Sequence, residues 1–160
     1  MINKIEINIK NYGDVIAKFD NDKLSQELAS FIYRECLTFP LKSKIEINIK
    51  SESKLSKTNQ NNITDMIHAY FGQEISHLLI VSKHQTYRQI VLFLLGVILI
   101  AFSALKILSY LYVLKEICLI IGWVMIWEVV YTLLFDDVKR RIKLKKYKQL
   151  CKAKINFFES

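Results

Sequence analysis

Apolar residues dominate the chain from residue 90 to residue 135, with only scattered charged positions. A hydrocarbon core roughly 30 Å thick requires about 20 such residues in a single helix, so this stretch is long enough for two spans. We expect the spans over 90–109 and 117–135, joined by a short turn that holds Lys115 and Glu116. Because backbone polar groups find no water inside a bilayer, both spans are predicted to be helices.

Isoleucine alternates with polar residues in the sequence Lys-Ile-Glu-Ile-Asn-Ile-Lys, which occurs at 4–10 and again, unchanged, at 44–50. A period of two is typical of a strand with one apolar face. Duplication is one origin of such a repeat, and a chance match among these frequent residue types is the other. The sequence leaves both origins open.

Each strand pattern is followed by a helical one. The first helix is expected after three capping residues and to end at Pro40, with a core stripe of Leu24, Leu28, Phe31 and Ile32. The capping residues are Asp20, Asn21 and Asp22. The second helix follows a polar linker at 51–62 and can continue into the first span, because no strong breaker separates the two. Its apolar stripe consists of Ile63, Met66, Ile67, Tyr70, Phe71, Ile75, Leu78 and Leu79.

These patterns predict an α/β membrane protein. A small cytoplasmic βαβα domain would occupy 1–88, with its two strands parallel and joined by a right-handed crossover. A transmembrane helical hairpin would occupy 89–135, and a basic juxtamembrane helix with a terminal strand would occupy 136–160. Two strands make a poor sheet, so we expect the alternating residues 154–158 to add a third strand to the cytoplasmic domain.

The net charge of +8 is unevenly distributed: residues 136–160 carry nine basic and three acidic side chains, whereas residues 1–89 carry twelve and ten. Basic residues flank both expected spans, which places both termini in the cytoplasm. No continuous apolar segment precedes the first strand, so we expect no signal peptide. The cysteines, Cys36, Cys118 and Cys151, are odd in number and far apart, and we expect them to be small apolar fillers without a disulfide.

Glu128 is the most unusual residue of the second span. A carboxylate inside a bilayer costs about 2.5 to 3.5 kcal/mol, so such a residue usually meets a partner or water. A role in membrane assembly, protonation, and snorkelling to the membrane surface are the alternatives that we weigh for it. Trp123 and Trp127 are expected to anchor or pack the same span.

The basic cluster after the second span is the candidate site for an acidic ligand, and its residues are Lys139, Arg140, Arg141, Lys143, Lys145, Lys146 and Lys148. Contact with anionic lipid and determination of topology explain them without any ligand. The alternative is a nucleotide held between this cluster, Arg88 and the sheet, with phosphate contacts from Arg88, Arg140, Arg141 and Lys143. We do not expect DNA binding, because no recognition motif accompanies the charge.

Enzymatic chemistry is not expected from this sequence. The four glycines form neither a P-loop nor a dinucleotide-binding fingerprint, and no nucleophile has a recognisable local signature. His77 and His84 are seven residues apart, and His68 lies on another face of the predicted helix, so their spacing does not suit a helical metal site. We therefore expect neither a metal nor a resident cofactor.

One motif resembles a widespread bacterial family of small two-span proteins, which carry a Gly-Trp-Val-x-x-Trp core followed by Leu-Phe-Asp or Leu-Tyr-Asp. This chain has Gly122-Trp123-Val124-Met125-Ile126-Trp127-Glu128, then Leu134-Phe135-Asp136, then a basic helix. It departs from the family where proline, glutamate and tryptophans are common, because it has Val129, Tyr131, Asp137 and Val138 there.

The same layout is similar to the two-transmembrane-β effectors of bacterial anti-phage defence, whose partner is a minimal CRISPR-polymerase-like nucleotide cyclase. The resemblance implies a cytoplasmic domain that senses a cyclic oligonucleotide as a regulatory ligand. It also implies spans that disrupt the inner membrane, and a cyclase encoded nearby.

The leading hypothesis is thus a non-enzymatic, multi-pass inner-membrane effector that forms a homo-oligomer. The competing hypothesis is a passive membrane adaptor that tethers a cytoplasmic protein, for example through an edge strand at 44–50. A transporter subunit is a third possibility, which is weakened because two spans line no pathway without multimerising.

Overall fold

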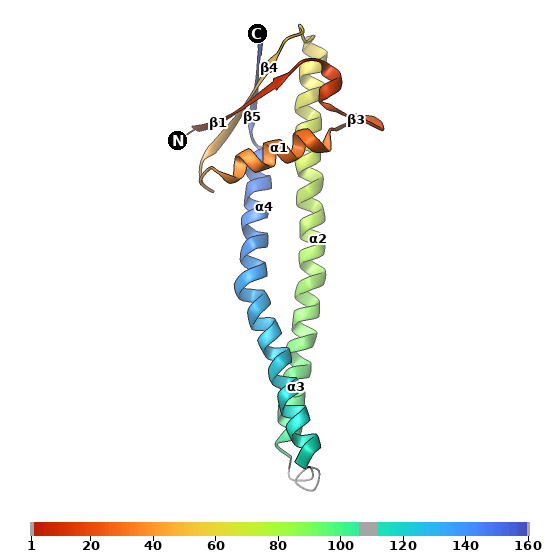
Figure 1. Ribbon diagram of the computed structural model, residues 1–160, viewed down its shortest axis with the longest axis vertical. Helices are drawn as coiled ribbons and strands as arrows, with labels where there is room; N and C mark the ends of the chain where they lie inside the picture. The colour runs from red at the N-terminus through yellow and green to blue at the C-terminus, as the bar shows by residue number, and fades with distance from the viewer. Residues whose placement is uncertain (1, 106–111, 160) are drawn as a thin grey trace. The chain divides into compact units, whose positions relative to one another are not determined.

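The computed structural model describes residues 2–105 and 112–159 and is mixed α/β (Figure 1). It divides into two compact units, which we call the α/β unit (Met1–His77 with Ile142–Ser160) and the helical unit (Leu78–Arg141). The elements in chain order are β1 (Ile2–Ile9), a 3-10 turn η1 (Tyr12–Asp14), β2 (Ile16–Ala17), β3 (Asp20–Leu24), α1 (Gln26–Leu37), β4 (Lys44–Ser51), α2 (Lys57–Ser103), α3 (Tyr112–Tyr131), a π-helical segment η3 (Thr132–Asp136), α4 (Asp137–Cys151) and β5 (Lys154–Glu159).

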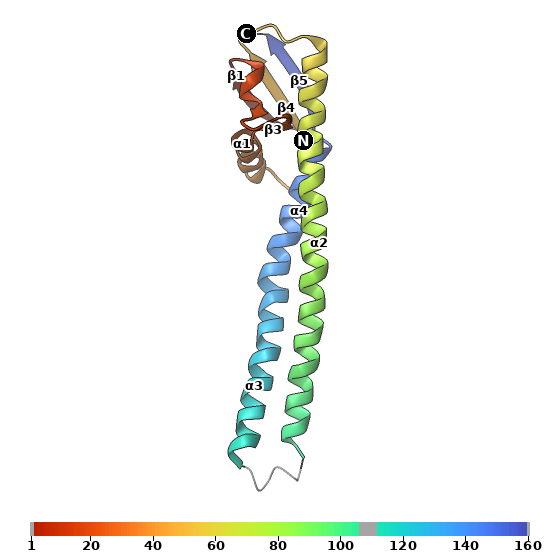
Figure 2. The same ribbon diagram turned by 90° about the vertical axis from the view of Figure 1, so that its right-hand side faces the viewer.

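A three-stranded parallel sheet of order β1-β4-β5 forms the centre of the α/β unit (Figure 2). The predicted third strand is therefore confirmed. The two copies of the repeat pair with an offset of two residues, so that Ile5 lies opposite Ile47 and Ile7 opposite Ile49. Because β4 pairs on both sides, the expectation that residues 44–50 form an edge strand is wrong; the outer strands are β1 and β5.

The core of the α/β unit is built on the isoleucine face of the sheet. Ile5, Ile7 and Ile9 of β1 are buried, as are the isoleucines of β4, whereas the alternate residues of β1 from Lys4 onwards are exposed. Tyr147 of α4 connects the helices, because its ring lies 5.0 Å from the ring of Tyr33 in α1 and 5.8 Å from that of Phe71 in α2. Burial of these apolar surfaces is the main force that stabilises the unit.

The segment before α1 differs from the prediction. Asp20, Asn21 and Asp22 do not cap a helix but lie in β3, which pairs antiparallel with β2, and α1 begins later, at Gln26. Of the predicted core stripe of this helix, Ile32 is buried, together with Ala29 and Cys36, whereas Phe31 is 43% exposed. Leu24 is buried as expected, but from the strand.

Helix α2 is continuous over 47 residues, which confirms that the second predicted helix runs on into the first apolar stretch. It begins at Lys57, so the polar linker is shorter than the expected 51–62. Its predicted core stripe is buried at Ile63, Met66, Ile67 and Phe71, whereas Leu79 is half exposed.

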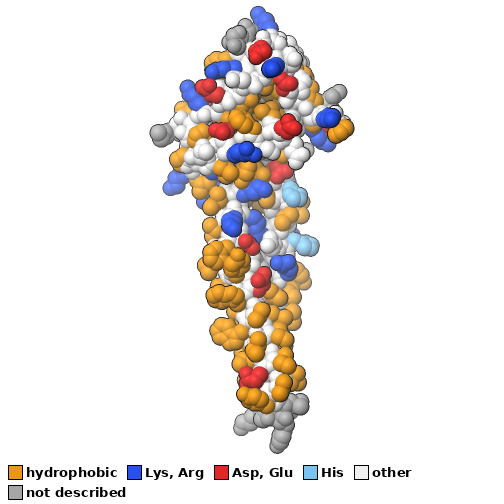
Figure 3. All heavy atoms as spheres, in the orientation of Figure 1, with side chains coloured by type: hydrophobic (Ala, Val, Ile, Leu, Met, Phe, Trp, Pro, Cys, Tyr) orange, Lys and Arg blue, Asp and Glu red, His pale blue; other side chains and the backbone are white. Residues whose placement is uncertain are grey.

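The helical unit contains the second part of α2, all of α3 and η3, and the start of α4. Both long helices are apolar and long enough to cross a membrane, and hydrophobic side chains cover much of the surface of this unit in Figure 3. Lys115 and Glu116, which were expected in the turn, lie within α3, so that prediction is wrong. The end of the expected first span, with Lys106, falls outside the described residues.

Gly96 of α2 and Gly122 of α3 bring the two helices into backbone contact. A methyl group added to Gly122 would lie 2.8 Å from the Gly96 carbonyl oxygen and 2.7 Å from a side-chain carbon of Ile100. Small residues permit such close helix approach in apolar surroundings. This contact fixes the pairing of the apolar helices within the helical unit.

Candidate functional sites

A cavity of about 670 Å³ opens in the α/β unit beside the amino-terminal ends of β4 and β5 and the last turns of α4. We call it the lysine groove. Its lining residues are Ile2, Leu41, Ser43, Lys44, Ile45, Glu46, Lys145, Lys148, Gln149, Lys152 and Lys154.

The folding of the chain brings lysines from three elements to this groove. Lys44 and Lys154 are the first residues of the adjacent parallel strands β4 and β5. Lys145, Lys148 and Lys152 follow one another at a spacing of three and four residues on and just after α4, which places them on one face. Five lysines thus face a single lining carboxylate, that of Glu46.

The groove combines this charge with an apolar wall. Ile2 and Leu41 are partly exposed there, and Ile45 is buried beneath. A lysine rim suits phosphate groups, whereas an apolar wall suits a flat, weakly polar ring. The arrangement can therefore hold a ligand that carries both kinds of group.

Gln149 organises the loop beside the groove. Its Nε2 donates to the Ser43 carbonyl oxygen at 2.9 Å and to the Pro40 carbonyl oxygen at 3.2 Å. Its Oε1 is buried and accepts no hydrogen bond from the described residues. The side chain thereby ties α4 to the segment before β4 and leaves one acceptor unused at the groove.

Lys146, which lies next to these groove lysines in the sequence, points in another direction. It is 2% exposed, and its Nζ donates to the carbonyl oxygens of Cys36, at 2.7 Å, and Phe39. Burial raises the pKa of the Cys36 thiol, although the Lys146 ammonium partly opposes this rise. Cys36 is therefore a structural thiol, in keeping with the expected filler role, and all three cysteines are free.

None of the four residues predicted to contact phosphate lines the lysine groove. Arg88 and Arg141 are exposed in the helical unit, and Arg140 of the same unit forms an ion pair with Asp137. Lys143 lies over the ring of Tyr147, 5.4 Å from its centroid. Sequence reasoning missed Lys152, because the predicted basic cluster ended at Lys148, and it missed Lys44 and Lys154, because only the pairing of β4 with β5 brings them together.

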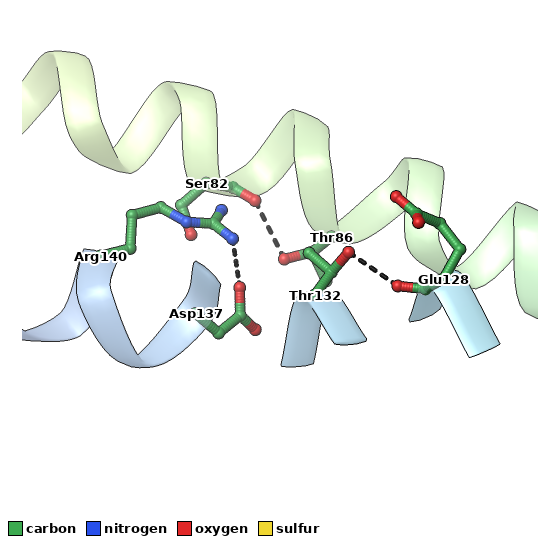
Figure 4. A network of polar contacts seen from close by, with 6 residues as sticks. All are labelled: Ser82, Thr86, Glu128, Thr132, Asp137 and Arg140. Atoms are coloured by element: carbon green, nitrogen blue, oxygen red, sulfur yellow. Dashed lines mark hydrogen bonds and ion pairs between the residues drawn. The ribbon is translucent and has the colours of Figure 1, made fainter. Parts of the chain in front are cut away.

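A line of polar residues lies along the facing parts of α2, α3 and α4 within the helical unit (Figure 4). We call it the polar seam, and its residues are Ser82, Thr86, Gln89, Glu128, Thr132, Asp137 and Arg140. Thr132 donates to the Glu128 carbonyl oxygen at 2.8 Å, and Thr86 donates to the Ser82 carbonyl oxygen at 2.9 Å. Thr132 also begins the π-helical segment η3, a kind of irregularity that is frequent at functional sites.

The residues predicted to act in membrane assembly lie together on α3. Trp123 and Trp127 are 61% and 66% exposed and are one turn apart, and Glu128 follows directly. The Glu128 side chain is exposed, and it has no ion pair with any residue in 2–105 or 112–159. A carboxylate on this apolar surface needs water or a further partner.

The part of the chain that the structure describes contains no group of three His, Cys, Asp or Glu side chains able to hold a metal ion. His68 instead lies with its Nε2 3.1 Å from the Ala153 carbonyl oxygen. No protein-family model matches the chain, and neither a curated protein nor a solved structure matches it.

Proposed function

We propose that this chain is a non-enzymatic effector of bacterial anti-phage defence that acts at the inner membrane. In this proposal the α/β unit senses a cyclic oligonucleotide made by a nearby nucleotide cyclase. The helical unit forms a transmembrane hairpin, with both termini in the cytoplasm, that disrupts the membrane when copies of the chain oligomerise.

The lysine groove is the observation that carries the proposal. Its volume of about 670 Å³ falls within the usual range of small-ligand sites, roughly 300 to 1,000 Å³. Five lysines supply positive charge for phosphate groups, and Ile2, Leu41 and Ile45 supply an apolar wall for a base. A cyclic oligonucleotide combines these two chemical features, and we assign the groove to it in place of the four residues named from the sequence.

The helical unit supports the membrane part of the proposal. Both of its long helices could span a bilayer by length and composition, and most of their large apolar side chains are exposed. Lys139, Arg141 and further basic residues follow in α4, where an anionic membrane surface would attract them. Helix α2 belongs to both units, so a conformational change in the α/β unit can be transmitted to the apolar helices along this continuous helix.

Expression in bacteria with and without a nucleotide cyclase tests the proposal, with dye uptake and membrane potential as readouts. The native chain is compared with a Lys148→Glu/Lys152→Glu variant and with a Lys18→Glu/Lys57→Glu control, whose exposed lysines lie outside the groove. We expect permeabilisation that responds to the cyclase in the native chain and in the control but not in the groove variant. Intact membranes in every culture would overturn the proposal.

The adaptor remains the second candidate, because the structure offers it two outer strands. β1 and β5 each pair on one side only, with β4, within the described sheet. An extended segment of a cytoplasmic protein can add to such an edge. Copurification of a stoichiometric protein partner from cells whose membranes stay intact would favour the adaptor.

A further inference from the structure

Two donors in the polar seam have no acceptor within residues 2–105 and 112–159. The side-chain Nε2 of Gln89 and the Nη1 of Arg140 are buried, and neither donates a hydrogen bond to any described residue. Gln89 is only 7% exposed, although it lies in an apolar helix that is long enough to span a bilayer. Buried polar groups without a partner are costly and are usually satisfied by ordered water.

Both helices contribute to the seam at helical spacing. Ser82, Thr86 and Gln89 recur every three or four residues on α2. The other residues of the seam are Glu128 of α3, Thr132 at the start of η3, and Asp137 and Arg140 of α4. Figure 4 shows Ser82 and Thr86 of α2 beside Thr132 and Arg140, with the Glu128 side chain extending from α3 on the side of α2. The seam thus offers hydroxyl, amide, guanidinium and carboxylate groups to water, with Gln89 and Thr132 buried and Thr86 and Glu128 exposed.

The seam ends at the glycine contact. Beyond Glu128 the two helices are in close contact. A methyl group added to Gly96 would lie 3.0 Å from the Gly122 carbonyl oxygen, and one added to Gly122 would lie 2.8 Å from the Gly96 carbonyl oxygen. Ile100, Met125 and Ile126 supply the other atoms at this contact. Water has no room to pass between the helices there.

We infer that the polar seam is a hydrated half-channel that admits small cations from the Arg140 end as far as Glu128. The Gly96–Gly122 contact closes it. Carboxylates in water-lined membrane cavities commonly bind cations, and Glu128 is the innermost charged group of the seam. This inference rests on the proposed placement of the helical unit in a membrane. It adds a pathway for water and cations within that unit.

Cysteine accessibility in inside-out vesicles tests the half-channel. In a chain whose native cysteines are replaced by alanine, single cysteines are placed in the seam by Gln89→Cys and Thr132→Cys, at positions whose native side chains are 7% and 3% exposed. Leu133→Cys and Val124→Cys are matched controls, because these side chains are 50% and 62% exposed on the apolar surface. A positively charged, membrane-impermeant methanethiosulfonate is the probe, since it reacts with the thiolate, which forms only where water reaches.

We expect the seam cysteines to react about tenfold faster or more than the controls, because apolar surroundings suppress the thiolate. Adding Glu128→Gln should slow the charged reagent at Thr132→Cys relative to a neutral one. Seam cysteines no faster than the controls, in a chain that stays in the membrane at alkaline carbonate, would overturn the half-channel alone. Release of the chain by carbonate would overturn the membrane placement and the half-channel with it.

Discussion

Lys146 donates from Nζ to the carbonyl oxygen of Cys36 at 2.7 Å and so joins α4 to the last turn of α1. A second donation, to the carbonyl oxygen of Phe39, satisfies another acceptor just after that helix. A cation at a helix carboxyl terminus also interacts favourably with the helix dipole. The buried ammonium therefore stabilises the junction of the two helices and is not free for a ligand.

Replacing Lys146 by methionine should destabilise the α/β unit. The substitution keeps the length of the side chain but removes the ammonium donor from both carbonyl oxygens; that of Cys36 keeps the Phe39 N–H at 3.3 Å, and the loss costs about 1–3 kcal/mol. Thermal unfolding in detergent, followed by far-ultraviolet circular dichroism, measures the effect. Lys148→Met is the control, because Lys148 is exposed and should change stability by no more than about 0.5 kcal/mol. Equal melting temperatures of the two variants would show that the buried contacts contribute nothing.

Charge reversal in the lysine groove should weaken binding of an anionic ligand. A fluorescent cyclic dinucleotide, titrated into the purified chain in detergent, is expected to bind at least about tenfold more weakly to Lys148→Glu/Lys152→Glu, a loss of about 1.4 kcal/mol. Lys18→Glu/Lys57→Glu carries the same net charge and should bind like the native chain. Binding of the native chain should also weaken with added salt, because the attraction is screened.

The groove could bind the phosphates of a soluble nucleotide or those of anionic lipid headgroups. Vesicles of anionic lipid, added as competitor in that experiment, distinguish the two. If the groove serves the nucleotide, excess anionic vesicles should not displace the dye-labelled ligand from the native chain. Displacement by vesicles, or equal affinity in both double variants, would contradict assignment of the groove to a soluble nucleotide.

Tyr147 should make the α/β unit sensitive to alkali. Burial first, and the neighbouring Glu74 carboxylate next, raise the pKa of its hydroxyl. The folded chain therefore holds this proton more tightly than the unfolded chain, in which tyrosine titrates near about 10. The stability that this contributes is complete below about pH 10 and is lost as the pH rises towards the folded-state pKa.

Melting temperatures of the native chain and of Tyr147→Phe, compared at about pH 8 and about pH 11, test this dependence. The native chain should lose more stability over that interval, because phenylalanine has no proton to release. Lysine titration affects both proteins alike and cancels in the comparison. Parallel losses in the two proteins would contradict the role of Tyr147.

The central sheet could be predicted from the sequence because its pattern is local. Alternation in the two copies of the repeat puts Ile5 and Ile47 on the apolar face of their strands, and this face is the buried one. The β2–β3 pair was missed for the opposite reason. Asp20 and Asp22 favour helix caps over strands, and pairing with β2 overrides that preference.

The candidate sites were less predictable, because they depend on contacts between distant segments. Lys146 and Lys148 are equivalent in a charge cluster, yet one is buried against α1 and the other lines the lysine groove. Lys44 and Lys154 are 110 positions apart and approach only through the pairing of β4 with β5. Glu128, by contrast, stood out in the sequence because a carboxylate is rare in an apolar helix.

Two glycine substitutions should each change the stability of a different unit of the chain. Gly122→Ala places a methyl group 2.8 Å from the Gly96 carbonyl oxygen, which the backbone can accommodate only if the helices move apart. Gly72 is also in α2, but an added methyl group meets nothing within 4 Å there. We therefore expect Gly122→Ala to destabilise the helical unit by about 1–3 kcal/mol. Gly72→Ala should stabilise the α/β unit by about 0.5–1 kcal/mol, because alanine favours the helix.

The tryptophans make the two effects distinguishable. Both tryptophans of the chain, Trp123 and Trp127, lie in α3, so their fluorescence reports on the helical unit, whereas circular dichroism reports on every helix. During thermal unfolding in detergent, Gly122→Ala should lower the midpoint seen by fluorescence, and Gly72→Ala should leave it unchanged while raising the transition seen by circular dichroism. An unchanged fluorescence midpoint in Gly122→Ala would mean that the glycine contact does not hold α2 and α3 together, and the closed end of the half-channel would lose its physical basis.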